Sequence, residues 1–204
     1  MSLDCRYLDL LMSSDVPCIH FYRWEKKTVT YGYFSKLEVL NLKRLKQDKW
    51  HVVKRPTAGG ILFHPYDFAF SLLVPARCTR ASLAYLAVAE LMQDVLHPLI
   101  PTSITSHDGE KASPFCMLHP RHFDLMYRGK KVMGVAQRRT RFGFLHQASI
   151  SLKPPDPAHV KLWVNGVQPD FQKTCFSFAD HLRVDTEKAR LLIERHILDF
   201  FTKK

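Results

Sequence analysis

Hydrophobic residues recur at two different spacings along the chain, and each spacing predicts a different kind of element. Helical spacing predicts helices at residues 3–12, 37–49, 82–96 and 186–201, the third with Ser82 as its N-cap. Alternating or continuous apolar stretches predict strands at residues 18–22, 28–33, 51–53, 68–74, 123–127, 130–137 and 142–152. Helices and strands alternate irregularly, so we expect an α+β fold in which helices flank a mixed β-sheet. The length of 204 residues predicts a single domain, residues 1–204.

A tight turn at Arg128 and Gly129 joins two of these strands. Glycine adopts the positive φ that a short hairpin requires. Lys131 follows in the second strand, and Gly134 permits a backbone or a ligand to approach closely. Two interpretations remain open: an exposed lysine in a basic hairpin, or a functional lysine.

A second glycine-rich turn is predicted at Ala58-Gly59-Gly60. Its amides are able to bind an anion or a carbonyl oxygen, and the alternative is an ordinary loop. Cys116 lies 15 positions before Lys131, in a polar segment, residues 102–120, that is predicted to be a loop. A thiol acts as a nucleophile only as its thiolate, which requires nearby positive charge such as that of Lys131. Cys116 is therefore either such a nucleophile or an inert cysteine.

Charge and composition narrow the choice of partners. The net charge is +11 and the pI about 9.6, which favours anionic partners. Nucleic acid is one candidate, but the basic residues are dispersed and show no nucleic-acid-binding motif. An acidic protein is a second candidate. Five scattered cysteines without a CxxC pair indicate neither disulfides nor a metal site, and they predict a reducing, cytoplasmic location. No apolar stretch approaches the roughly 20 residues that span a membrane. No helix shows a second apolar stripe, so a monomer is expected.

Three features together resemble the lipoate-protein ligase A family. The segment from Lys54 to His64 is similar to the family motif R-R-x-(T/S)-G-G-(G/R)-x-V-x-H, and the segment from Lys131 to Ala136 is similar to K-(V/I)-x-G-x-A. Cys116 stands where the cysteine-using octanoyltransferase branch has its nucleophile, so the resemblance is greatest to that branch. The resemblance implies the catalytic-domain fold that the family shares with biotin protein ligases.

The resemblance also implies which residues act. Lys131 and Cys116 would be the catalytic residues. The substrate-binding residues would come from the glycine motif, the strand that lines the acyl pocket and the strands around Lys131: Arg55, Thr57, Gly59, Gly60, His64, Phe70, Gly134, Ala136 and His146. No metal ligand is implied.

Several positions depart from the family pattern. Ala58 and Lys54 replace a usual glycine and arginine, and His146-Gln147 reverses a usual Gln-His pair. In a strand, that exchange moves the imidazole to the other face, which leaves the role of His146 open. Residues 120–124 lack the Asn-Asp pair typical of ATP-dependent ligases, and we expect no C-terminal accessory domain of the kind that those ligases carry. These two absences weaken the ATP-dependent ligase interpretation, whereas Ala58 and Lys54 count against the transferase interpretation.

We therefore expect an enzyme of protein lipoylation that attaches an octanoyl or lipoyl group to a specific lysine of lipoyl carrier domains. The favoured form transfers octanoyl from octanoyl-carrier protein through a cysteine thioester and needs no cofactor. The alternative is a lipoate-protein ligase that uses ATP, Mg²⁺ and lipoate through lipoyl-AMP. The implied partners are acidic lipoyl domains, of 2-oxoacid dehydrogenase E2 or glycine cleavage H protein, and acyl carrier protein. A third interpretation is a non-catalytic basic binding protein of the same fold.

Overall fold

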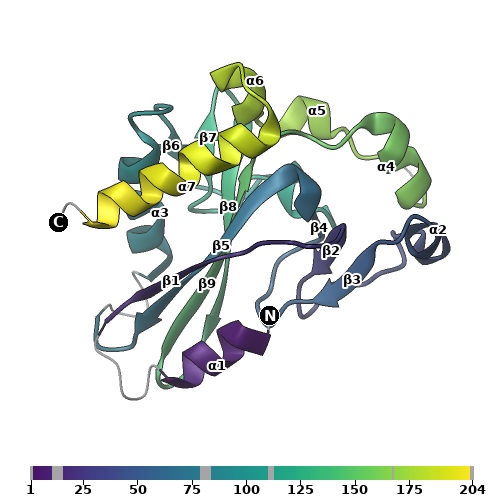
Figure 1. Cartoon of the computed structure of the whole chain (residues 1–204). Helices are drawn as coiled ribbons and strands as arrows, with labels where there is room; N and C mark the ends of the chain where they lie inside the picture. The colour runs from purple at the N-terminus through teal and green to yellow at the C-terminus, as the bar shows by residue number, and fades with distance from the viewer. Residues whose placement is uncertain (1, 11–15, 79–83, 110–112, 167, 203–204) are drawn as a thin grey trace.

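The predicted hairpin around Arg128 and Gly129 lies within a six-stranded sheet in the computed structural model of the chain, which describes residues 2–10, 16–78, 84–109, 113–166 and 168–202 (Figure 1). The order is β1-β5-β9-β8-β7-β6, and every neighbouring pair is antiparallel. The strands are β1 (Cys18–Phe21), β5 (Asp67–Pro75), β6 (Ser103–Ile104), β7 (Leu125–Tyr127), β8 (Lys130–Arg139) and β9 (Gly143–Ser151). Because β8 has a partner on each side, the side-chain directions of the segment that carries Lys131 are fixed.

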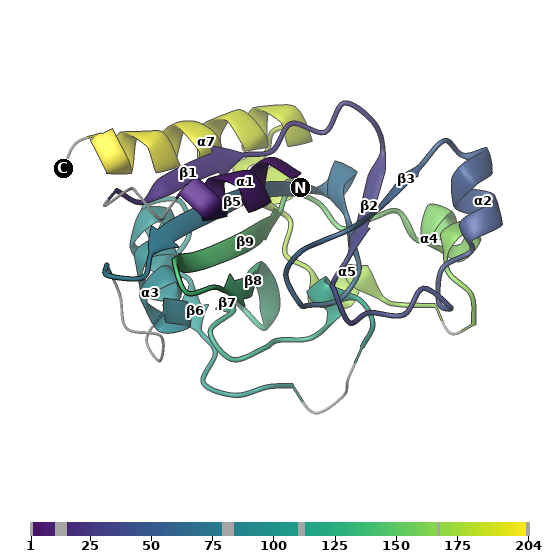
Figure 2. The same ribbon diagram turned by 90° about the horizontal axis from the view of Figure 1, so that it is seen from below.

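A second, three-stranded sheet lies beside the first. β2 (Thr28–Tyr31) pairs in parallel with β3 (His51–Lys54) and antiparallel with β4 (Leu62–Phe63). Around it lie the short helices α2 (Leu42–Gln47), α4 (Pro157–Trp163) and α5 (Phe171–Thr174). They share a buried cluster that includes Trp50, Phe63 and Trp163. Figures 1 and 2 show the small sheet with α2 and α4 on one side of the main sheet and α3 (Ala84–Leu96) on the other.

Alternation along β5 gives the main sheet two different faces. Phe68, Phe70 and Leu72 lie in the main core with residues of α3 and α7 (Thr186–Thr202). The intervening residues of β5 point toward the small sheet and α1 (Ser2–Leu10), whose Leu8 packs against Leu73. This second face forms the floor of a pocket.

The predicted α+β class, with helices flanking a sheet, is confirmed, and the parallel pairing that makes the arrangement mixed lies in the small sheet. The helix predicted at residues 37–49 is shorter, since α2 spans only Leu42–Gln47. Leu40 instead pairs with Val164, and the Asn41 side chain accepts a hydrogen bond from the Arg44 N–H and caps the helix. Lys49 has a φ of 59°, which is incompatible with a continuing helix.

The polar segment 102–120 is not wholly a loop, because it contains β6 and a short 3-10 turn, η2 (Cys116–Leu118). Several other short elements were not predicted: β4, α4, α5, α6 (Phe178–Leu182) and a second 3-10 turn, η1 (His64–Tyr66). Each is too short to show a clear hydrophobic period. Ser82 and residues 11–12 lie outside the described residues. Within the described ranges, no helix has the length and apolar character needed to cross a membrane.

Candidate active site

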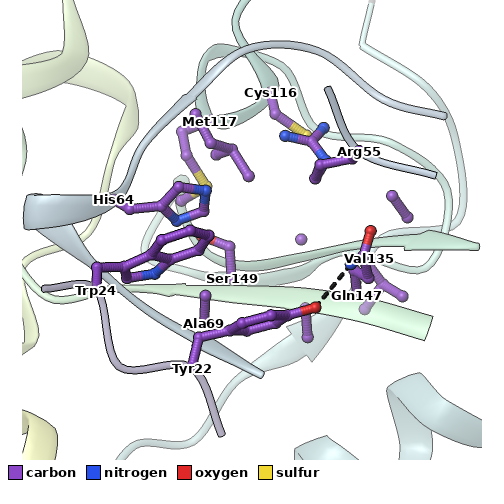
Figure 3. A pocket seen from close by; sticks show the side chains of 14 residues that line it. Tyr22, Trp24, Arg55, His64, Ala69, Cys116, Met117, Val135, Gln147 and Ser149 are labelled. Atoms are coloured by element: carbon purple, nitrogen blue, oxygen red, sulfur yellow. Dashed lines mark hydrogen bonds between the residues drawn. The ribbon is translucent and has the colours of Figure 1, made fainter. Parts of the chain in front are cut away.

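A pocket lies between the second face of the main sheet and the small sheet (Figure 3). Its lining comes from both sheets and from η2: Tyr22, Trp24, Arg55, Leu62, His64, Ala69, Cys116, Met117, Gly134, Val135, Ala136, Gln147, Ala148 and Ser149. Figure 3 shows the Cys116 sulfur beside the Arg55 guanidinium at one end, and Tyr22 with Gln147 at another. Five of the predicted site residues therefore line one pocket: Cys116, Arg55, His64, Gly134 and Ala136.

Cys116 is held at the pocket by backbone hydrogen bonds to the glycine-rich segment. The Cys116 N–H donates to the Ile61 carbonyl (3.0 Å), and the Ile61 N–H donates to the Pro114 carbonyl (2.7 Å). A Cβ on Gly60 would lie 2.4 Å from the Pro114 oxygen, so a side chain at this position would collide with the backbone. The close approach of these two segments places the half-buried Cys116 thiol in the pocket wall.

Gly59 lies where Cys116 and Arg55 meet. Its φ of +93° is one that glycine adopts readily and other residues do not. A Cβ on Gly59 would lie 3.2 Å from Nη2 of Arg55, 3.4 Å from Cβ of Ala136 and 3.8 Å from Sγ of Cys116. The guanidinium and the thiol are therefore near neighbours.

Arg55 is buried, and its charge is held in place by neutral acceptors. It donates to the Thr30 hydroxyl (2.5 Å) and to the Gly60 carbonyl (2.6 Å). Burial lowers the pKa of Arg55, and the adjacent Cys116 opposes that shift. A guanidinium nevertheless remains charged in proteins. Positive charge beside a thiol is the environment in which nucleophilic cysteines are found.

Lys131 approaches Cys116 through the cysteine backbone rather than its sulfur. Its Nζ donates to the carbonyl oxygens of Cys116 (2.8 Å) and His119 (3.1 Å) and forms an ion pair with Asp124 (2.5 Å). The lysine is only 1% exposed. Gly134 leaves space for it, since a Cβ there would lie 2.9 Å from Nζ. The structure thus brings Lys131 and Cys116 together, but the ammonium holds the turn that carries the cysteine.

Asp124, the ion-pair partner of Lys131, was not predicted from the sequence as a site residue. Burial raises the pKa of Asp124, and the Lys131 ammonium opposes that shift. Its carboxylate also accepts a hydrogen bond from the Arg121 N–H (2.7 Å). The pairing of β7 with β8 shifts register at Leu125 and Met126, and such bulges re-aim neighbouring side chains. Sequence spacing does not show a register shift, so this pairing was missed.

His64 forms one wall of the pocket and is fixed on both ring nitrogens. Nε2 lies 2.7 Å from the Thr30 hydroxyl, and Nδ1 lies 3.0 Å from each carboxylate oxygen of Asp67. The ring stacks on Trp24 with centroids 4.1 Å apart. Because Thr30 also accepts from Arg55, His64 supports the position of the guanidinium.

Gln147 closes another side of the pocket through a buried network. Its side chain accepts from the Thr57 hydroxyl (2.6 Å) and donates to the Asp4 carboxylate (2.8 Å) and the Tyr22 hydroxyl (2.7 Å). Asp4, on α1, is fully buried and also accepts hydrogen bonds from Tyr22 and Ser71. Thr57, a predicted binding residue, is not in the pocket lining and contacts it through Gln147. The members of this network are far apart in sequence, so no local pattern revealed it.

Phe70 and His146, two of the predicted binding residues, are not in the lining of this pocket. Phe70 belongs to the core on the α3 and α7 face of the sheet, and the His146 ring lies 6.0 Å from the ring of Tyr85 on α3. Both are fully buried, and within the described part of the chain neither His146 nitrogen has a hydrogen-bond partner. Burial lowers the pKa of His146 to about 4, so this imidazole is neutral near pH 7.

The amino-acid sequence is similar to a known family of catalytic domains and to several curated proteins. The sequence model of the family described as "Lipoyl protein ligase A/B catalytic domain" matches residues 1–185. An octanoyltransferase LipM from Oceanobacillus iheyensis is 29% identical over 160 residues, covering 74% of this chain and 59% of the relative. A second LipM, from Lysinibacillus sphaericus, is 28% identical over 167 residues, covering 74% and 60% respectively. The chain thus spans about 60% of the length of these curated relatives.

Solved structures share the fold. A lipoate-protein ligase A bound with ATP has a TM-score of 0.74 and 19% identity, over 98% of this chain and 78% of that chain. A bipartite lipoate protein ligase from Thermoplasma acidophilum, studied with its E2 lipoyl domain, has a TM-score of 0.70 and 19% identity, over 98% and 76%. These similarities show the fold, and the family follows from the sequence match over residues 1–185. The chain belongs to the family of lipoyl protein ligase A/B catalytic domains.

Proposed function

We propose that this chain carries out protein octanoyl transfer, with Cys116 as the nucleophile that carries the acyl group. The proposal rests on one observation: the Cys116 thiol lies in the wall of a largely apolar pocket, beside the Arg55 guanidinium. In this proposal the pocket receives the acyl chain while the thiol attacks its carbonyl carbon. The octanoyltransferases that match 74% of the chain support the same activity.

The reaction has two acyl-transfer steps. In the first, the Cys116 thiolate attacks the thioester carbon of the donor, a new S–C bond forms, and the donor thiol leaves with the proton that Cys116 gave up. In the second, the neutral amine of the acceptor lysine attacks the Cys116 thioester, an amide forms, and Cys116 leaves as a thiol with the amine proton. The covalent intermediate divides one difficult step into two easier ones.

The residues around the thiol have separate roles in this proposal. Arg55 provides the charge that balances the thiolate. The backbone amides of the turn at residues 58–60 stabilise the oxyanion that develops on the carbonyl oxygen, because Gly59 lies beside the sulfur. Lys131 and Asp124 hold η2 so that the sulfur points into the pocket. The proposed donor is octanoyl-carrier protein, the proposed acceptor is a lipoyl domain, and neither step requires ATP.

Intact-mass analysis tests the proposal. After mixing with octanoyl-carrier protein without ATP, the wild-type protein is expected to gain one octanoyl group, and Cys116→Ser is expected to gain none. Cys18→Ser, which changes an exposed cysteine of β1, is the matched control and should keep the adduct. An octanoyl adduct that persists in Cys116→Ser would contradict the proposal.

The same protein samples also test the two alternative functions, an ATP-dependent ligase and a non-catalytic binding protein. Lipoylation of a lipoyl domain only when lipoate, ATP and Mg²⁺ are present, with no octanoyl adduct, would indicate an ATP-dependent ligase. Inactivity in both assays would indicate a non-catalytic binding protein.

A further inference from the structure

Two aromatic residues that follow β2 are exposed to solvent. Phe34 is 83% exposed and Tyr33 is 53% exposed, and their rings meet edge to face with centroids 5.1 Å apart. Within the described ranges, no other large hydrophobic residue is as exposed as Phe34. Exposed aromatic side chains of this size are enriched where proteins bind other proteins. We call Tyr33 and Phe34 the aromatic tip.

The aromatic tip is tied to the glycine turn that borders the candidate nucleophile. The Tyr33 N–H donates to the Thr57 carbonyl (2.8 Å), and the Ser35 hydroxyl donates to the Gly59 carbonyl (2.7 Å). A Cβ on Gly32 would lie 1.9 Å from the Gly59 oxygen, so the two loops pack backbone against backbone. Since Gly59 is also next to the Cys116 sulfur, a partner seated on the tip lies beside the mouth of the active site.

The surroundings of the tip carry positive charge. A shallow groove is lined by the tip and four neighbours: Pro56, Ala58, Gln137 and Arg138. This lining contains an arginine and no carboxylate. The Lys54 ammonium lies 4.1 Å from the centroid of the Tyr33 ring, a cation–π contact that adds a second cation to the rim. The groove therefore complements a surface that combines an apolar contact with carboxylates.

We propose that the aromatic tip and this groove are the docking surface for an acidic acceptor lipoyl domain. The inference rests on the proposed function, because a carrier domain must bring its lysine to the Cys116 thioester. Phe34 provides the apolar anchor, while Arg138 and Lys54 pair with carboxylates of the domain. Loading of Cys116 from a small thioester does not require this surface.

Binding of an unmodified lipoyl domain of 2-oxoacid dehydrogenase E2, measured by surface plasmon resonance, tests the surface directly. Phe34→Ser and Arg138→Glu are each expected to weaken binding by roughly tenfold or more, as loss of an interface anchor or reversal of a complementary charge does. The matched controls are on the solvent side of α7: Leu191→Ser removes an exposed leucine, and Arg195→Glu reverses an exposed arginine. Both controls are expected to bind like wild type.

A parallel measurement keeps this inference separate from the proposed function. Acylation of Cys116 by a small octanoyl thioester is followed by intact mass in every variant, and the docking variants are expected to load at the wild-type rate. Wild-type loading together with unchanged lipoyl-domain binding in Phe34→Ser and Arg138→Glu would overturn the docking surface and leave the transferase intact. Failure of every variant to load, with binding still weakened in those two, would overturn the transferase and support the docking surface. A wild-type protein that does not bind the domain would also overturn the inference.

Discussion

Among the described residues, the Nζ of Lys131 has one acceptor group for each of its three N–H groups, and this decides what Lys131 does in the site. Its acceptors are Asp124 and the carbonyls of Cys116 and His119, and an ammonium has three donors. A group used in this way fixes the turn that carries the candidate nucleophile. The sequence spacing predicted that Lys131 and Cys116 belong to one site, but it placed the positive charge at the thiol on Lys131, whereas the structure places the Arg55 guanidinium there.

Asp124→Asn should destabilise the protein, because it leaves the buried Lys131 ammonium without its counter-charge. Breaking a buried ion pair from one side costs about 3–5 kcal/mol of unfolding free energy. Adding Lys131→Met to Asp124→Asn removes the unpaired charge and should restore much of that loss. Urea unfolding followed by circular dichroism measures both effects. Equal stability of Asp124→Asn and the wild type would show that the pair contributes nothing to folding.

Gly134→Ala should slow the proposed acylation of Cys116 by displacing Lys131. A methyl group at this position would lie 2.8 Å from Cε of Lys131, so the lysine must move and release the turn at Cys116. Displacements of this order reduce rates by roughly tenfold to a hundredfold. We therefore expect slower octanoylation of Cys116, measured by time-resolved intact mass. When Lys131→Met is already present, Gly134→Ala should lower the rate of Cys116 octanoylation little further. A full loss of rate in that background would show that Gly134 does not act through Lys131.

At the scale of elements, β9 shows which structural features an alternating strand pattern predicts and which it does not. The period of two predicts that His146 and Gln147 face opposite sides, and they do. The sequence does not tell which side holds the pocket, because β9 is buried along its whole length and both faces are covered. The same ambiguity applies to β5, where the large apolar side chains of Phe68, Phe70 and Leu72 lie in the core and the small Ala69 lines the pocket.

The burial of His146 behind the sheet makes the protein sensitive to acid. Its pKa is about 4 in the folded protein and about 6.5 in an unfolded chain, so the unfolded state binds the extra proton first as the pH falls. The folded state should therefore lose stability between about pH 6.5 and pH 4, by roughly 3 kcal/mol in total, with no further loss from this group below pH 4.

His146→Leu removes the titrating group and should flatten the dependence of the unfolding free energy on pH across that window. Urea midpoints at a series of pH values measure the slope. His97→Leu, which changes an exposed histidine after α3, is the control and should keep the wild-type slope. A slope that His146→Leu leaves unchanged would assign the acid sensitivity to other groups.

At the scale of the whole molecule, the sequence predicted the fold class and the meeting of the glycine turn, Cys116 and Lys131. The fold class is confirmed, and the three site features lie close together because each depends on a local motif and on strands long enough to show their period. The contacts that shape the rest of the site are long-range, such as that between Asp4 on α1 and Gln147 on β9. Single-sequence patterns do not encode which distant elements pack together, so Asp4, Asp124 and Gln147 emerged only from the structure.

Under the proposed function, the net charge of +11 predicts how fast the chain associates with an acidic lipoyl domain. Long-range attraction between a cationic protein and an acidic domain raises their rate of association. Salt screens this attraction, because the Debye length falls from about 10 Å at 0.1 M to about 3 Å at 1 M. The kcat/KM for transfer to a lipoyl domain should therefore fall by roughly tenfold or more between about 0.05 and 0.5 M salt. Loading of Cys116 from a neutral octanoyl thioester lacks this attraction and should change little. Steady-state transfer assays and intact-mass loading assays at matched salt concentrations measure how each rate depends on salt. An equal salt dependence of the two rates would mean that the positive charge does not serve recognition of the lipoyl domain.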